Sequence, residues 1–222
     1  MVESRGGTGP LTAAIEDLVI CGWAGRDKAA TEHHIGELEA LGVKRPTSTP
    51  IYYRVAAARL TADPVIEDVG ANSSGEVETV LLSCSGGLYV GVGSDHTDRQ
   101  VETYGVSISK QVCDKPLAAT VWPYEEVADH WDSLVLRSFA VIEGKRRKYQ
   151  EGAVSELLPP ADLLRGLNEA GELPEGTALF GGTVPAIGGV QMASRFEGEL
   201  EDPVLKRVIR FGYDLKILPI RT

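Results

Sequence analysis

Two β-favouring segments separated by a pair of glycines constrain the fold more than any other part of this chain. Residues 76–82 (EVETVLL) and 88–92 (LYVGV) lie on either side of Gly86-Gly87. Runs of β-branched and aromatic residues around a glycine turn are typical of a β-hairpin. A chain built on this hairpin is expected to be rich in strands.

The rest of the chain adds strands and a few helices. Further strands are predicted at residues 17–22, 134–142, 177–180 and 204–217, and helices at residues 27–41 and 159–170. Residues 94–110 are expected to begin as a helix capped by Asp95 or Thr97, and residues 181–189 to form a glycine-rich turn. Strands and helices do not alternate regularly, which argues against a doubly wound sheet. The predicted fold class is α+β, mostly β, with a few peripheral helices.

Length and composition favour one soluble domain. The 222 residues suit a single core, and we interpret residues 1–10 as a flexible N-terminal tail and residues 11–222 as one domain. The formal net charge of −10 disfavours nucleic acid as a partner. No apolar run approaches the roughly 20 residues of a membrane span, and the polar first ten residues are unlike a signal peptide. Three widely spaced cysteines indicate free thiols in a reducing compartment, so we predict a cytoplasmic protein without a membrane partner.

Two glutamates on the first hairpin strand form a candidate cation site. Glu76 and Glu78 are two residues apart, and side chains two apart in a strand point to the same face. Neighbouring carboxylates repel each other unless a cation lies between them, and Mg²⁺ and Ca²⁺ prefer oxygen ligands. The alternative is a solvated strand face.

The segment after the hairpin supplies another carboxylate and a cation. Asp95 and Arg99 are four residues apart, one helical turn, so both could face one site. Asp95 would then be a third oxygen ligand, and Arg99 would orient it. The alternative is a helix cap with an ordinary surface ion pair.

A histidine–glutamate pair lies on the predicted helix at residues 27–41. His34 and Glu37 are three residues apart and share a helix face, and His33 and Glu37 are four apart. A carboxylate beside a histidine fixes its tautomer and raises its basicity, which suits a general base acting on water. An exposed polar helix is the alternative, and the sequence leaves open which histidine would be the base.

Taken in order, these pieces resemble the fumarylacetoacetate hydrolase (FAH) superfamily. That superfamily has an H-x-x-E helix, an E-x-E strand, a D-x-[ST]-x-R segment, a lysine and a G-T-P-like turn. The corresponding residues here are His34 and Glu37, Glu76 and Glu78, Asp95 to Arg99, Lys110, and Gly182-Thr183-Val184-Pro185. The match extends over roughly residues 18–218.

The resemblance implies a role for each of these residues. Glu76, Glu78 and Asp95 would bind a divalent cation, Mg²⁺, Mn²⁺ or Ca²⁺, which would act as a Lewis acid on a 2-oxo carboxylate. Lys110 would be catalytic, with His34 and Glu37 activating water from a lid at residues 27–42. Arg99, Glu102 and Thr183 would bind the substrate, a small anionic 2-oxo acid, and the resemblance implies a homodimer and an FAH-like β-sandwich roll.

Several departures from the superfamily pattern leave the reaction open. The interval between Glu78 and Asp95 is short, and the turn reads Gly-Thr-Val-Pro, so the chain is interpreted as a divergent branch. The first hypothesis is a hydrolase that cleaves a C–C bond in a 2,4-dioxo acid such as an acylpyruvate. The second is a lyase or tautomerase of the oxaloacetate decarboxylase kind. A non-catalytic ligand-binding protein that keeps the fold is the third.

Overall fold

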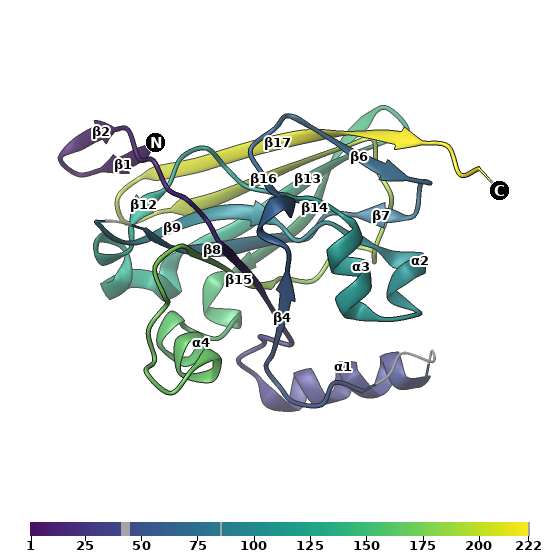
Figure 1. Cartoon of the computed structure of the whole chain (residues 1–222), viewed down its shortest axis with the longest axis horizontal. Helices are drawn as coiled ribbons and strands as arrows, with labels where there is room; N and C mark the ends of the chain where they lie inside the picture. Colours follow the sequence, from purple (N-terminus) through teal and green to yellow (C-terminus); the bar gives the residue numbers. More distant parts are fainter. Residues whose placement is uncertain (41–44, 85, 222) are drawn as a thin grey trace.

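Two β-sheets form the centre of the molecule (Figure 1). The computed structural model describes residues 1–40, 45–84 and 86–221. One sheet has six strands in the order β12-β9-β8-β15-β3-β4, and the other has five in the order β14-β13-β16-β17-β6. The strands of the first sheet are β3 (Asp17–Gly22), β4 (Ile51–Val55), β8 (Val77–Cys84), β9 (Gly87–Ser94), β12 (Trp122–Pro123) and β15 (Thr177–Thr183). Those of the second are β6 (Val65–Val69), β13 (Val135–Ile142), β14 (Lys145–Ala153), β16 (Arg195–Asp202) and β17 (Arg207–Leu218).

The predicted hairpin is confirmed. Strands β8 and β9 pair antiparallel, with Val77 opposite Ser94 and Glu78 opposite Gly93. Parallel pairing of β15 with β3 and antiparallel pairing of β15 with β8 place this hairpin in the middle of the six-stranded sheet. The acidic end of β8 is therefore held by neighbours on both sides.

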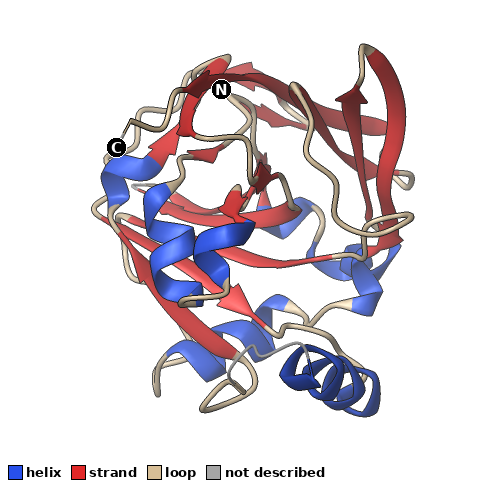
Figure 2. Ribbon diagram, turned by 90° about the vertical axis from the view of Figure 1, so that its right-hand side faces the viewer, coloured by secondary structure: helices blue, strands red, loops and turns tan. Residues whose placement is uncertain are grey.

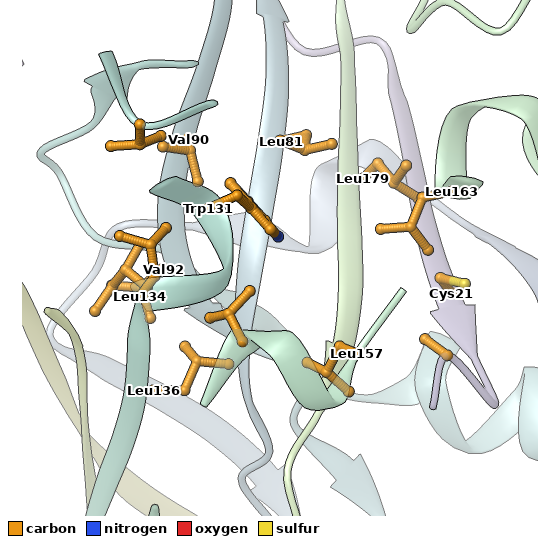
Figure 3. Packing of buried hydrophobic residues seen from close by; sticks show 14 of the residues in the cluster. Cys21, Leu81, Val90, Val92, Trp131, Leu134, Leu136, Leu157, Leu163 and Leu179 are labelled. Atoms are coloured by element: carbon orange, nitrogen blue, oxygen red, sulfur yellow. The ribbon is translucent and has the colours of Figure 1, made fainter. Parts of the chain in front are cut away.

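The largest hydrophobic cluster joins the two sheets. Leu81 and Leu179 come from the six-stranded sheet, and Leu136 and Leu200 from the five-stranded one, and each is at most 1% exposed. Trp131 belongs to the same cluster, and Figure 3 shows it together with Leu81, Leu136 and Leu179. Burying a side chain of this size contributes roughly 1.5–3 kcal/mol, so packing between the sheets fixes their relative position.

In the described part of the chain, four α-helices lie around the sheets: α1 (Lys28–Ala40), α2 (Arg99–Glu102), α3 (Val106–Val112) and α4 (Pro160–Leu167). Helix α1 lies at the lower edge of the molecule in both views (Figures 1 and 2). Ile35 anchors it, with 2% of its surface exposed. Helix α4 confirms the helix predicted at residues 159–170, and its Leu163 and Leu164 are buried. Among the described residues, every helix is too short or too polar to span a bilayer.

The predicted helix start after the hairpin is wrong. Ser94 still belongs to β9, and the Asp95 amide donates to the Glu76 carbonyl at 2.9 Å, so the sheet ladder continues past the strand end. Strand β10 (Thr97–Asp98) then pairs with β7 (Ser73–Ser74). The helix begins at Arg99, and its cap is Asp98, whose carboxylate accepts two main-chain N–H groups. Sheet pairing at both ends of the segment overrides its local helix propensity.

Two other segments also differ from expectation. The first residues, predicted as a flexible tail, form the strands β1 (Val2–Ser4) and β2 (Gly7–Gly9), and the Glu3 amide donates to the Val121 carbonyl at 2.9 Å. The first glycines of the predicted 181–189 turn belong to β15 and stay in the sheet.

Two short strands, β5 (Leu60–Thr61) and β11 (Lys115–Pro116), pair in parallel. The mostly β, α+β class is confirmed.

Candidate metal centre

Three carboxylates converge at the open end of the β8–β9 hairpin. The pairing of Val77 with Ser94 extends to Glu76 and Asp95, which lie opposite each other. Directly opposite residues of an antiparallel pair share one face, and so do residues two apart. Glu76, Glu78 and Asp95 therefore point to the same side, where one carboxylate oxygen from each lies within 4.8 Å of the others.

Glu78 is the more deeply buried glutamate of the pair, with 2% of its surface exposed. Burial, together with the negative charge of Asp95, raises the pKa of Glu78 well above its ordinary value. The Gly182 amide donates to its Oε2 at 2.8 Å. A bulge in β15 creates this contact, because the register between β15 and β8 shifts between Phe180 and Thr183.

Gly182 is needed at this bulge for two reasons. Its φ is +96°, a conformation that L side chains rarely adopt, and a Cβ there would lie 2.5 Å from the Ala24 Cβ. The glycine-rich run thus brings a main-chain donor against a buried carboxylate.

Two lysines face Asp95, which is fully buried. Lys110, from α3, makes a short contact with Asp95 Oδ2 and lies 4.0 Å from Glu76 Oε2. Lys115 lies 3.4 Å from Asp95 Oδ1. Burial alone would raise the pKa of Asp95, but the charges of Lys110 and Lys115 outweigh it and lower that pKa. Asp95 is therefore held as a carboxylate.

Arg99 contacts two acidic side chains. Its guanidinium lies 3.1 Å from Glu76 and 3.1 Å from Glu102, and its Nε donates to the Ser74 hydroxyl at 2.7 Å. Burial would lower the pKa of Arg99, but Glu76 and Glu102 raise it. The structure thus brings Arg99 and Glu102 to the site, with Arg99 directed at a candidate metal ligand.

Thr183 lies beside the same strand. Its hydroxyl donates to the Val77 carbonyl at 2.8 Å and accepts from the Gln150 amide at 2.8 Å. Gln150 also donates to the Val184 carbonyl and accepts from the Val77 amide. The hydroxyl of Thr183 thus holds β15 to β8, and its substrate-binding role stays a prediction.

Helix α1 contains the positions of the predicted histidine–glutamate pair, so the main chain there is helical as predicted. The side chains of His34 and Glu37 lie outside the described residues, as do residues 41–44 at the end of the predicted lid. His33 is exposed. The role of this pair in water activation stays a prediction.

Sequence reasoning missed a buried polar layer beneath the carboxylates. His96 is 0% exposed, and its ring contacts Asp68 and Tyr213, each at 2.9 Å. Tyr213 donates to the Ser94 hydroxyl at 2.8 Å. Asp68 and Tyr213 are 28 and 117 residues from His96, and their spacing gives no signal in the sequence.

The residues present fit a divalent cation. All three donors are carboxylates, which hard cations such as Mg²⁺, Mn²⁺ and Ca²⁺ prefer. Asp95 Oδ1 is buried and faces the Lys115 ammonium at 3.4 Å, but it accepts no hydrogen bond within the described part of the chain, so it has lone pairs available. Buried polar atoms are nearly always satisfied in proteins, and a cation would satisfy this one.

Comparison with known protein families identifies the family of this chain. A family model described as "Protein of unknown function (DUF2848)" matches residues 21–213. The chain belongs to this family. Among curated proteins, none matches the sequence of this DUF2848 member.

Solved structures share the fold of the DUF2848 chain at low sequence identity. Cg1458 with an inhibitor has a TM-score of 0.66 and 13% identity over 93% of this chain and 78% of that one. A 2-keto-3-deoxy-D-arabinonate dehydratase complexed with magnesium and 2,5-dioxopentanoate has a TM-score of 0.63 and 16% identity, covering 93% and 74%. The 4-oxalocrotonate decarboxylase from Pseudomonas putida G7, complexed with calcium and acetate, has a TM-score of 0.53 and 16% identity, covering 90% and 76%. These TM-scores establish a common fold, and the predicted FAH-like fold is confirmed.

Proposed function

We propose that this protein is a divalent-metal-dependent enzyme acting on a small 2-oxo acid, in a divergent branch of the FAH superfamily. One observation carries the proposal: carboxylate oxygens of Glu76, Glu78 and Asp95 lie within 4.8 Å of one another at a partly buried strand end. Two solved structures with the same fold are complexes with magnesium or calcium, which supports the choice of cation.

The charges around the site favour an anionic substrate. The acidic groups Glu76, Glu78, Asp95 and Glu102 face the cations Arg99, Lys110 and Lys115. With a cation bound and all four acids ionised, four negative charges, three positive side chains and the two charges of the cation give an excess of one positive charge. A 2-oxo carboxylate complements that charge.

The proposed reaction is hydrolytic C–C cleavage of a 2,4-dioxo acid. The bound cation would supply Lewis acidity toward the 2-oxo carboxylate. Water, deprotonated by His34 with Glu37 behind it, would add to the distal ketone carbon. The C–C bond then breaks, its electron pair stays with the 2-oxo fragment as an enolate, and a proton returns to that carbon. Lys110, beside Asp95, would hold the substrate carboxylate.

A lyase reaction is the second candidate. The similar solved structures include a dehydratase and a decarboxylase. Lys110 and the carboxylates suffice for such a reaction, whereas the hydrolase also needs the pair on α1. Replacing His34 by Ala separates the two: near-complete loss of turnover supports the hydrolase, and a retained rate with oxaloacetate supports the lyase.

Calorimetric titration with Mn²⁺ tests the metal site. Glu76→Ala should abolish the Mn²⁺ affinity of the wild type, and Glu199→Gln, on β16 and paired with Arg210 at 2.9 Å, should leave it unchanged. Consumption of an acylpyruvate by the Mn²⁺-loaded protein would then support the enzyme. Equal Mn²⁺ affinity in Glu76→Ala and wild type would remove the metal site, and binding without turnover of any 2-oxo acid would favour a non-catalytic ligand-binding protein.

A further inference from the structure

Trp23 has a main-chain conformation that bulky residues rarely adopt. Its φ is +58°, and the only other non-glycine residues with positive φ in the described part of the chain are Glu143 and Lys206. Those two lie in the connections β13–β14 and β16–β17, whereas Trp23 follows the end of β3 directly. Conformations of this kind persist only where the surrounding structure enforces them, and they are common at functional sites.

The main chain is fixed on both sides of Trp23. Gly22 is paired with Ile51 at the end of β3. On the other side, the Leu158 amide donates to the Ala24 carbonyl at 2.8 Å. The left-handed turn at Trp23 is therefore enforced by its neighbours.

The residues next to Trp23 adjoin the metal centre. A Cβ at Gly22 would lie 2.7 Å from the Tyr53 ring, so the end of β3 passes directly against that ring. Ala24 lies against Gly182, where an added Cβ would be 2.5 Å from the Ala24 Cβ, and the amide of Gly182 donates to a candidate metal ligand. Trp23 is thus placed between an aromatic ring and the bulge that reaches the carboxylates.

Tyr53 connects the indole of Trp23 to the charged residues of the site. Burial raises the pKa of the Tyr53 hydroxyl, while the Lys110 ammonium and the indole, which donates a hydrogen bond to that hydroxyl, lower it. The charges of Glu102 and Asp95 act on the same hydroxyl and raise its pKa further. Lys110 Nζ lies 5.8 Å from the centre of the Tyr53 ring. The indole is therefore next to the aromatic ring that borders the charged cluster.

The surface that Trp23 offers is apolar. The N–H of an indole is its only polar group, and the Tyr53 hydroxyl accepts from it, so the faces of the ring remain for apolar contacts. The nearest cation along the chain is Arg26, which donates to Asp132 at 2.7 Å and to the Leu157 carbonyl at 3.0 Å. Within the described residues 22–27, both ends of that guanidinium are engaged elsewhere, so the segment does not offer a cation to a second carboxylate.

We propose that Trp23 determines substrate specificity: its indole, held by Tyr53, is the wall against which the distal part of the 2-oxo acid packs, and it selects an uncharged aliphatic or aromatic tail. The inference rests on the proposed function and adds the class of substrate to it. Lys110, the proposed partner of the substrate carboxylate, lies against the Tyr53 ring, so a tail that extends past this ring meets the indole. A second carboxylate there would lose its hydration against an apolar ring, which is costly.

Calorimetry with the Mn²⁺-loaded protein tests this preference through binding. The probes are pyruvate, 2-oxohexanoate and 2-oxoglutarate, none of which is a 2,4-dioxo acid that the proposed reaction would cleave. The chain of 2-oxohexanoate is longer than that of pyruvate by three methylene groups, and each buried methylene strengthens binding by about fourfold. We expect 2-oxohexanoate to bind at least about tenfold more tightly than pyruvate or 2-oxoglutarate.

Two variants assign the preference to the indole. Trp23→Ala should weaken the binding of 2-oxohexanoate by about tenfold or more and leave that of pyruvate unchanged, because only the longer chain reaches the indole. Trp23→Phe keeps an apolar ring and should retain the preference. Tryptophan emission should respond to 2-oxohexanoate in wild type and not in Trp23→Phe, since Trp122 and Trp131 are 0% and 5% exposed.

Tyr104→Ala is the matched control for loss of an aromatic side chain. Tyr104 lies between α2 and α3 and is 81% exposed. The control should keep the wild-type affinity for all three acids.

The outcomes separate this inference from the proposed function. If Mn²⁺-loaded wild type binds none of the three acids, the proposed function fails and the inference fails with it. If it binds pyruvate as tightly as 2-oxohexanoate, or binds 2-oxoglutarate best, the proposed function stands and the apolar wall is overturned. Equal losses for pyruvate and 2-oxohexanoate in folded Trp23→Ala, checked by circular dichroism, would leave Trp23 only a structural role. Should Trp23→Ala not fold, an emission change of equal size in wild type and Trp23→Phe overturns the contact.

Discussion

The amide of Asp95 donates to the carbonyl of Glu76 at 2.9 Å. This main-chain contact continues the ladder of the β8–β9 hairpin by one pair and sets Asp95 opposite Glu76. A shift of one residue in a strand register sends every side chain to the other face. The candidate metal centre therefore depends on the register of one hairpin.

Glu78→Gln is expected to separate metal binding from folding. Gln can still accept the hydrogen bond from the Gly182 amide, and it avoids burying a carboxylate whose pKa is raised. The metal-free variant should be at least as stable as wild type in urea unfolding. Its Mn²⁺ affinity should fall by at least about tenfold, because ligand charge tunes affinity at oxygen sites. A variant that keeps its affinity would exclude Glu78 as a ligand.

The stability of the metal-free protein should fall as pH rises through the range where Glu78 titrates. Burial and the charge of Asp95 raise its pKa in the folded state above the value of about 4.3 expected in the unfolded chain. Between these two values the folded state binds more protons, so the free energy of unfolding decreases with increasing pH. Urea unfolding in a chelating buffer at several pH values measures this slope. Glu78→Gln should show a smaller decrease, and equal slopes would contradict the assignment.

Mn²⁺ affinity should rise with pH over the same range. Carboxylate ligands bind a cation in the deprotonated form, and burial raises the pKa of Glu78, so metal binding in the range where Glu78 titrates should release a proton from it. Calorimetry in two buffers of different ionisation enthalpy would count the protons released. Affinity that stays constant with pH, with no proton release, would show that Glu78 is already ionised in the metal-free protein.

Gly182→Ala should destabilise the protein more than Gly144→Ala. Both glycines have positive φ, +96° and +74°, but a Cβ at Gly182 would lie 2.5 Å from the Ala24 Cβ, whereas one at Gly144 meets nothing within 4 Å. Strain in the left-handed region costs roughly 1–2 kcal/mol at either position, and overpacking adds roughly 1–3 kcal/mol at Gly182. Thermal unfolding measures the difference. Equal losses would show that Ala24 can move aside.

Gln150→Leu should lower the free energy of unfolding by roughly 2–4 kcal/mol, since it leaves several buried polar groups without partners. Gln150 accepts from the Val77 amide at 3.0 Å and donates to the Thr183 hydroxyl and the Val184 carbonyl. The exposed Gln100, which accepts a hydrogen bond from Asn72, provides the control Gln100→Leu. If both variants unfold at the same urea concentration, the network around Thr183 does not stabilise the fold.

The hairpin, the helix α1 and the E-x-E pair could be predicted from the sequence because each is a local pattern. Residues two apart in a strand share a face whatever surrounds them, so the placing of Glu76 and Glu78 followed from alternation alone. The helix predicted after Ser94 failed because Asp95, Thr97 and Asp98 pair with Glu76 and β7, partners that lie about 20 residues earlier in the chain. Local propensity carries no information about such partners.

The amino-acid sequence by itself determined the β-rich class, the pair of glutamates and the order of the charged motifs. Only the tertiary structure decided that Asp95 lies opposite Glu76, that the Gly182 amide reaches Glu78 and that the ammonium of Lys115 is buried beneath the site. The physical reason is that burial depends on contacts between segments distant in the chain. The sequence does not distinguish a lysine that main-chain carbonyls and a carboxylate surround from a lysine on the surface.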